Sequence, residues 1–125
     1  MARVLIAEDE EALCAMCARA LAMAGHEVKT ARDGAEALEA LAREPGRFDL
    51  LLTDVRMPIM DGIALALAAA RDFPDLTILL MTGYADQRER AQGLEAIVHD
   101  VIAKPFSVAT LRAAVNEALT VKARG

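Results

Sequence analysis

Residues 50–62, LLLTDVRMPIMDG, contain the pattern that decides the fold. An apolar run ends at Asp54, and Arg56 and Pro58 then interrupt any regular pattern before Asp61 and Gly62. A run that is apolar at consecutive positions is typical of a strand covered on both faces of a parallel sheet. Ligand sites of such sheets lie at the carboxyl ends of the strands. We therefore interpret Asp54 as a functional carboxylate at the tip of a buried strand.

Length and composition predict one domain that comprises residues 1–125. The chain has 125 residues, of which 55% are hydrophobic and 26% charged, so it can bury a core but is too short for two ordinary domains. The net charge of -5, without a run of Lys or Arg, argues against direct binding of nucleic acid, which depends on neutralising phosphates. No apolar stretch approaches the ~20 residues of a spanning helix, and acids at positions 8–11 interrupt any signal peptide. We expect a cytoplasmic protein without membrane insertion.

Short β-like runs alternate with longer helical patterns along the whole chain. This alternation predicts an α/β fold with a parallel five-stranded sheet and helices on both faces. Gly25 closes the first helix and Ser107 caps the last one. The predicted strands span 3–7, 27–31, 48–54, 76–82 and 100–103, and the predicted helices span 11–24, 35–44, 63–72, 85–96 and 107–122.

Polar residues follow or end four of the five predicted strands. Glu8 and Asp9 follow the first, Asp54 ends the third, Thr82 ends the fourth and Lys104 follows the fifth. Three carboxylates in one crevice repel one another unless a cation joins them, so their convergence predicts a hard divalent ion. Mg²⁺ suits this donor set, because it binds oxygen ligands and keeps positions open for water or phosphate oxygens.

These residue types together predict phosphoryl transfer. An Asp carboxylate such as Asp54 can attack a phosphoryl group and form an aspartyl phosphate, while Lys104 and the metal ion neutralise charge on the transferring oxygens. After transfer, Lys104 and the Thr82 hydroxyl can each contact a phosphoryl oxygen. The site is therefore predicted to be a switch that reports whether Asp54 is modified.

The chain resembles the receiver domain of bacterial two-component response regulators over nearly its whole length. The resemblance is carried by the acidic pair Glu8-Asp9, by Asp54 within DVRMPIMDG, by Thr82 within MTGYAD and by Lys104 within KPF. It implies Mg²⁺ bound by Glu8 or Asp9, by Asp54 and by the main-chain carbonyl of Arg56. It also implies a flavodoxin-like (βα)5 three-layer sandwich with strand order 2-1-3-4-5. The implied phosphoryl donor is the phosphohistidine of a sensor histidine kinase or histidine phosphotransferase.

A narrower resemblance concerns the output. Residues 79–91, LLMTGYADQRERA, and residues 99–107, HDVIAKPFS, are similar to the CpdR-type single-domain regulators, which control a Clp-type AAA+ protease. We therefore expect a stand-alone receiver that alters the binding of a protein partner. It should catalyse only its own phosphorylation and dephosphorylation at Asp54.

The sequence departs from many receivers at the usual switch aromatic, three residues before the Lys, where it has Val101. Valine has no comparable side-chain swing. Tyr84, two residues after Thr82, is a candidate for coupling the phosphoryl group to the fourth helix instead.

Alternative functions remain open at this point. A haloacid-dehalogenase-type phosphatase also forms an aspartyl phosphate, but it carries a second Asp two residues after the nucleophile, where this chain has Arg56. A degenerate scaffold receiver would have lost part of the acid, Thr and Lys set, which is intact. The chain could also be the receiver fragment of a larger transcriptional regulator.

Cys14 and Cys17 form a CxxC spacing inside a helical pattern. Without a second CxxC or a nearby His to complete a zinc site, we interpret both as small core residues.

Overall fold

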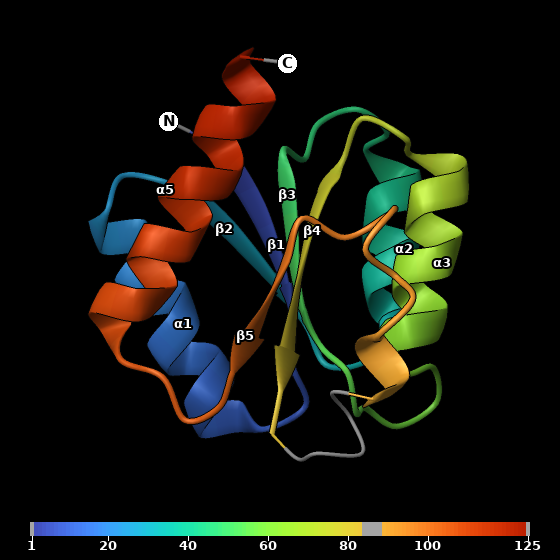
Figure 1. Cartoon of the computed structure of the whole chain (residues 1–125), viewed down its shortest axis with the longest axis horizontal. Helices are drawn as coiled ribbons and strands as arrows, with labels where there is room; N and C mark the ends of the chain where they lie inside the picture. Colours follow the sequence, from blue (N-terminus) through green and yellow to red (C-terminus); the bar gives the residue numbers. More distant parts are fainter. Residues whose placement is uncertain (1, 84–88, 125) are drawn as a thin grey trace.

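The computed structural model describes residues 2–83 and 89–124 of the chain. Its five parallel strands form one sheet with the order β2-β1-β3-β4-β5 (Figure 1). This order confirms the predicted flavodoxin-like topology. The strands are β1 (Arg3–Ala7), β2 (Glu27–Ala31), β3 (Leu50–Asp54), β4 (Thr77–Thr82) and β5 (Asp100–Ala103).

Helices cover both faces of the sheet and complete the predicted three-layer sandwich (Figure 1). Alternate strand residues face opposite layers, so that Leu5 and Leu51 pack with α2 and α3 while Val4 and Leu50 pack with α1 and α5. All five residues of β3 are buried, as expected for a central strand covered on both faces. The helices are α1 (Glu11–Met23), α2 (Gly34–Arg43), α3 (Gly62–Asp72) and α5 (Val108–Arg124). Within the described residues, no helix is long and apolar enough to cross a membrane.

Side-chain caps fix where three of these helices begin. Asp33 accepts a hydrogen bond from the Glu36 N–H at 2.8 Å, which caps α2. Asp61 accepts one from the Ala64 N–H at 2.9 Å and caps α3. The predicted cap at Ser107 is confirmed, because its hydroxyl oxygen lies 3.0 Å from the Thr110 amide nitrogen.

The two cysteines lie on the inner side of α1, as predicted. Cys17 is fully buried in the core layer of α1 and α5, and Cys14 packs partly buried against the same layer. Burial raises the pKa of the Cys17 thiol to about 11, so this thiol stays protonated at neutral pH. Both residues are free cysteines with a packing role.

The predicted helix at 85–96 is wrong in its C-terminal half. Residues 84–88 lie outside the described residues, residues 89–91 are helical, and residues 92–93 and 95–97 form turns. Gly93 adopts φ +89°, a left-handed conformation that ends a helix. Ala91 and Val98 are buried on either side of this bend, so core packing holds the segment in a shape that a continuous helix would not allow.

Gly62, the first residue of α3, lies against the end of the central strand. A Cβ at this position would come within 1.8 Å of the Asp54 carbonyl oxygen and 3.0 Å of the Val55 Cα. Its N–H donates to the Val55 carbonyl at 2.8 Å. Only glycine allows α3 to begin this close to Asp54.

Gly62→Ala should therefore lower the free energy of unfolding by about 3 kcal/mol or more, because the added methyl group meets main-chain atoms that cannot move aside. Gly25→Ala is the matched control. It has nothing within 4 Å of the new Cβ and only the strain of φ +95°, about 1–2 kcal/mol. Urea denaturation of both variants measures the difference, and equal losses would contradict the close approach.

Candidate functional site

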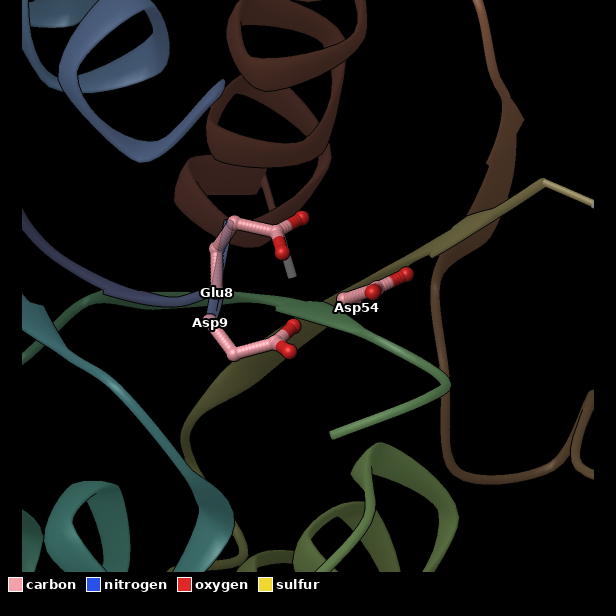
Figure 2. A group of neighbouring side chains, drawn as sticks. All are labelled: Glu8, Asp9 and Asp54. Atoms are coloured by element: carbon pink, nitrogen blue, oxygen red, sulfur yellow. The ribbon is translucent and has the colours of Figure 1, made fainter. Parts of the chain in front are cut away.

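Three carboxylates converge beyond the ends of β1 and β3. Glu8 and Asp9 follow β1, Asp54 ends β3, and one oxygen from each lies within 4.8 Å of the others. Figure 2 shows that the side chains of Glu8 and Asp9 extend toward the side on which Asp54 lies. Glu8 is 2% exposed and Asp54 5% exposed, whereas Asp9 faces solvent. A set of carboxylate oxygens at this spacing suits a hard divalent cation such as Mg²⁺.

The register of the parallel sheet produces this convergence. Ala7 pairs with Thr53, so the next residues along the two strands, Glu8 and Asp54, come to the same level. In the same way, Thr82 pairs with Ala103, which brings Lys104 just beyond Thr82. Residues distant in sequence therefore share one edge because parallel strands end together.

Lys104 connects the two buried carboxylates. Its Nζ lies 2.9 Å from Glu8 Oε1 and 3.0 Å from Asp54 Oδ1, and its side chain is 19% exposed. Its main-chain N–H donates to the Thr82 carbonyl at 2.7 Å, so β4 and β5 are joined at this level. The ammonium group is thus held at the centre of the site.

Burial and charge shift the pKa values of these groups. Burial raises the pKa of Glu8 and of Asp54, against the opposing effect of Lys104. For Lys104, burial lowers the pKa, but hydrogen bonds to Glu8 and Asp54 outweigh it and leave the pKa raised. The charged forms of Glu8 and Asp54 are therefore disfavoured, and a bound cation would stabilise them.

Thr82 contributes a buried hydroxyl group that no described residue hydrogen-bonds. The residue is fully buried at the end of β4, and within the described ranges its Oγ1 makes no hydrogen bond. A buried polar group without a partner is costly, and such groups are rare outside sites of function. The hydroxyl is available to a group that arrives beside Asp54.

The carboxylates open into a crevice of about 950 Å³. Its lining combines the polar residues of the site with apolar side chains from α1, from the segment after β3 and from the segment after β5. The lining comprises Glu8, Asp9, Glu10, Leu13, Met16, Asp54, Arg56, Met57, Pro58, Gly83, Lys104, Pro105 and Phe106. Asp54, although 5% exposed, therefore lines the same hollow as Glu8, Asp9 and Lys104.

The structure brings together Glu8, Asp9, Asp54 and Lys104, and Arg56 lines the same crevice. Val101 lies outside it. It is 37% exposed and, with Thr82, lines a second hollow of about 410 Å³ next to residues 91–98. The predicted coupling residue Tyr84 lies outside the described residues.

An ion pair joins Asp61 and Arg90, whose side-chain atoms lie 2.5 Å apart, and it was not predicted from the sequence. This pair ties the start of α3 to residues 89–91. The two residues lie far apart in the chain and on different elements, so neither helical nor strand periodicity could have indicated the contact.

Comparisons with known proteins agree with this geometry. The sequence model of the response regulator receiver domain matches residues 4–116. The response regulator receiver protein CpdR of Brucella abortus is 42% identical over 117 residues, which cover 94% of this chain and 93% of that protein. The transcriptional regulatory protein PrrA of Mycobacterium tuberculosis is 35% identical over 94% of this chain and 49% of that protein. The chain thus spans about half the length of several curated relatives that it matches.

Solved structures give the same result. A CheY-like response regulator receiver domain protein of Methanospirillum hungatei superposes with a TM-score of 0.89 and 28% identity, covering 99% of this chain and 98% of that chain. TrrA of Thermotoga maritima, solved in complex with Mg(2+)-BeF, has a TM-score of 0.84 and 28% identity, covering 95% of this chain and 100% of that chain. The chain belongs to the response regulator receiver domain family, the phosphoryl-accepting switches of two-component systems.

Proposed function

We propose that this receiver accepts a phosphoryl group on the carboxylate of Asp54 from the phosphohistidine of a sensor histidine kinase or histidine phosphotransferase. The observation that carries the proposal is the placement of Asp54. Its carboxylate is buried at the end of β3, 3.0 Å from the Lys104 ammonium and beside an open crevice. A carboxylate in contact with a fixed cation is suited to attack at phosphorus, because the charge on the transferred oxygens is neutralised at once.

Glu8, Asp9, Asp54 and the main-chain carbonyl of Arg56 are the proposed ligands of Mg²⁺. The convergence of three carboxylates within 4.8 Å supports the assignment of the side chains. The Arg56 carbonyl rests on the family resemblance and on the position of Arg56 in the crevice lining. When bound, Mg²⁺ supplies positive charge that offsets repulsion between the carboxylates and the incoming phosphoryl oxygens.

Lys104 and Thr82 are the proposed sensors of phosphorylation. Lys104 forms an ion pair with Asp54 and a hydrogen bond with Glu8, and its ammonium group can donate to a phosphoryl oxygen on Asp54. The buried Thr82 hydroxyl, which bonds to none of the residues that the structure describes, can donate to another phosphoryl oxygen. The same residues would catalyse transfer from a small donor and hydrolysis of the aspartyl phosphate, so the chain acts on itself and has no separate substrate.

The proposed output is altered binding of a protein partner, in the cytoplasm. The likeness to CpdR over 93% of that protein supports a stand-alone receiver and makes a Clp-type protease system the first partner to test. The likeness to PrrA supports the alternative, in which the receiver is part of a larger transcriptional regulator. Val101 and Tyr84 remain the proposed positions for transmitting the signal.

Phosphorylation is the first prediction of this proposed function. Incubation with Mg²⁺ and acetyl phosphate should increase the intact mass by one phosphoryl group, because Asp54 lines the crevice and lies 3.0 Å from Lys104. Asp54→Ala should abolish the gain, while Asp75→Ala, which removes an exposed acid, should retain it. A phosphoryl group that survives Asp54→Ala would assign the acceptor to another residue.

Metal binding is the second prediction. Because the folded pKa values of Glu8 and Asp54 exceed the ordinary 4.5 and 3.8, the folded protein binds these protons more tightly than the unfolded chain does. The stability that they contribute is present at low pH and is lost as pH rises through the raised values. Mg²⁺ at ten times its dissociation constant should restore about 1.4 kcal/mol near pH 7.5 and much less near pH 4, where protons compete for the carboxylates.

Urea denaturation with and without MgCl2 at the two pH values measures this effect. Asp9→Asn should weaken the stabilisation by Mg²⁺ while leaving Glu8 and Asp54 in place. Stabilisation of equal size at both pH values would show that Mg²⁺ binds elsewhere.

Thr82→Val is the third prediction, because it removes the buried hydroxyl with little change of shape. The free protein should gain about 1 kcal/mol of stability or remain unchanged, since an unsatisfied polar group is lost. The additional stabilisation by Mg²⁺ with beryllium fluoride, a phosphoryl mimic, should fall by about 1.5–3 kcal/mol, the range for hydrogen bonds to charged groups. Thermal denaturation gives both values, with Thr120→Val on the surface of α5 as the control. Full stabilisation of Thr82→Val by the mimic would remove Thr82 from the sensing role.

A further inference from the structure

The turn after the phosphoacceptor strand has an unusual residue at its centre. The Met60 N–H donates to the Pro58 carbonyl at 2.7 Å, which closes a three-residue turn around Ile59. Ile59 has φ +69°, the value of the classic γ-turn, a rare and strained conformation. A β-branched side chain is the least suited to positive φ, where Gly and Asn are favoured.

The neighbouring residues hold this turn in place. The Gly34 N–H at the start of α2 donates to the Met60 carbonyl at 2.9 Å, and a Cβ on Gly34 would come within 2.4 Å of that oxygen. Met60 itself packs against the core, and Asp61 caps α3. The strain at Ile59 therefore persists because contacts on its C-terminal side fix the path of the chain.

The Ile59 side chain gains nothing from this position within the chain itself. It is 85% exposed, more than any other large hydrophobic residue among the described ones, including Met23 at 71% and Leu67 at 52%. Conformational strain and full exposure of an apolar side chain are both unfavourable, and a polar or small residue would avoid both. An outlier of this kind at a site rim is a reason to look for a function.

Ile59 directly follows Pro58, which lines the crevice that contains Asp54. For transfer, the N–P bond of the donor phosphohistidine breaks as an O–P bond forms to an Asp54 oxygen. The imidazole leaves with the electron pair of the broken bond and takes up a proton. Because these atoms must come into contact at the floor of the crevice, a protein donor has to cover its rim, whereas a small donor can enter alone.

We propose that Ile59 is a docking residue for the phosphodonor protein, which buries this side chain in an apolar pocket when its phosphohistidine reaches Asp54. The inference rests on the proposed function, since it names a contact that the donor makes at the same site. Ile59 touches no reacting atom, so its effect is confined to transfer from a protein. It acts as a specificity residue that separates donors with a complementary pocket from those without one.

Three variants test this role. Ile59→Asn replaces the apolar group and suits positive φ better, Ile59→Leu keeps an apolar group of the same size, and Met23→Gln removes a different exposed apolar side chain. Met23 lies at the opposite end of α1 from Glu8 and Asp9 and serves as the control. Histidine kinases and histidine phosphotransferases encoded in the source genome are phosphorylated with a radiolabelled phosphoryl group and screened as a panel. The donor that transfers this group fastest to the wild-type chain is used.

Ile59→Asn should slow transfer from this donor about tenfold, as the loss of one buried apolar side chain implies. It should leave phosphorylation by acetyl phosphate unchanged. It should also raise the folded-to-unfolded ratio about fivefold or more through relief of strain. Ile59→Leu should keep most of the transfer rate, and Met23→Gln should match the wild type. Higher stability together with slower transfer distinguishes docking from a structural role.

Wild-type transfer rates for Ile59→Asn would overturn the inference while leaving Asp54 as the acceptor. Equal slowing with acetyl phosphate would also overturn it, because the change would then act on the chemistry and not on docking. Transfer from acetyl phosphate but from no protein donor would exclude the proposed contact. Failure of acetyl phosphate as well would overturn the proposed function itself.

Discussion

The contact of the Lys104 ammonium with the carboxylates of Glu8 and Asp54 is the interaction on which the rest of the site depends. Glu8 and Asp54 are almost fully buried, and Lys104 is the cation that lies within 3.0 Å of both. With Asp9 beside them, three carboxylates face one ammonium group, so the described part of the site has an excess of negative charge. Burial raises the pKa values of Glu8 and Asp54, and repulsion from a neighbouring carboxylate adds to the shift of each. A divalent cation would offset both effects.

The fold holds this charge arrangement in place through the ends of its strands. Because β1, β3, β4 and β5 are parallel and in register, their last residues reach one edge without further adjustment. Gly62 then allows α3 to start against the Asp54 carbonyl, and Asp61 caps that helix. The loop between them is therefore short and pinned at its far end, which concentrates its conformational strain at Ile59. The position of this loop and its strain at Ile59 both follow from the close approach of α3 to the end of β3.

Much of this could be predicted from sequence because periodicity reflects burial. The apolar run at 50–54 and the helical patterns around it predicted elements whose ends lie within two residues of those observed. The convergence of the acids could be predicted because parallel strands end at the same edge of the sheet. The prediction of a helix at 85–96 was wrong in its C-terminal half, because the left-handed conformation of Gly93 and the burial of Val98 depend on tertiary packing. The γ-turn at Ile59 and the lack of a hydrogen bond from Thr82 to any described residue were also not predictable, since neither leaves a periodic pattern.

The hydrogen bonds at the site also limit how the proposed phosphorylation of Asp54 can change the structure elsewhere. A phosphoryl group on Asp54 would compete with Glu8 for Lys104 and would attract the Thr82 hydroxyl. The main chains of Thr82 and Lys104 are joined by a 2.7 Å hydrogen bond, so a shift of either residue moves the ends of β4 and β5 together. Val101 lies on β5 with 37% of its surface exposed and offers no large side chain to rotate. In the proposed switch, the signal is therefore a displacement of the main chain at the β4–β5 edge and of residues 89–98 packed beside it.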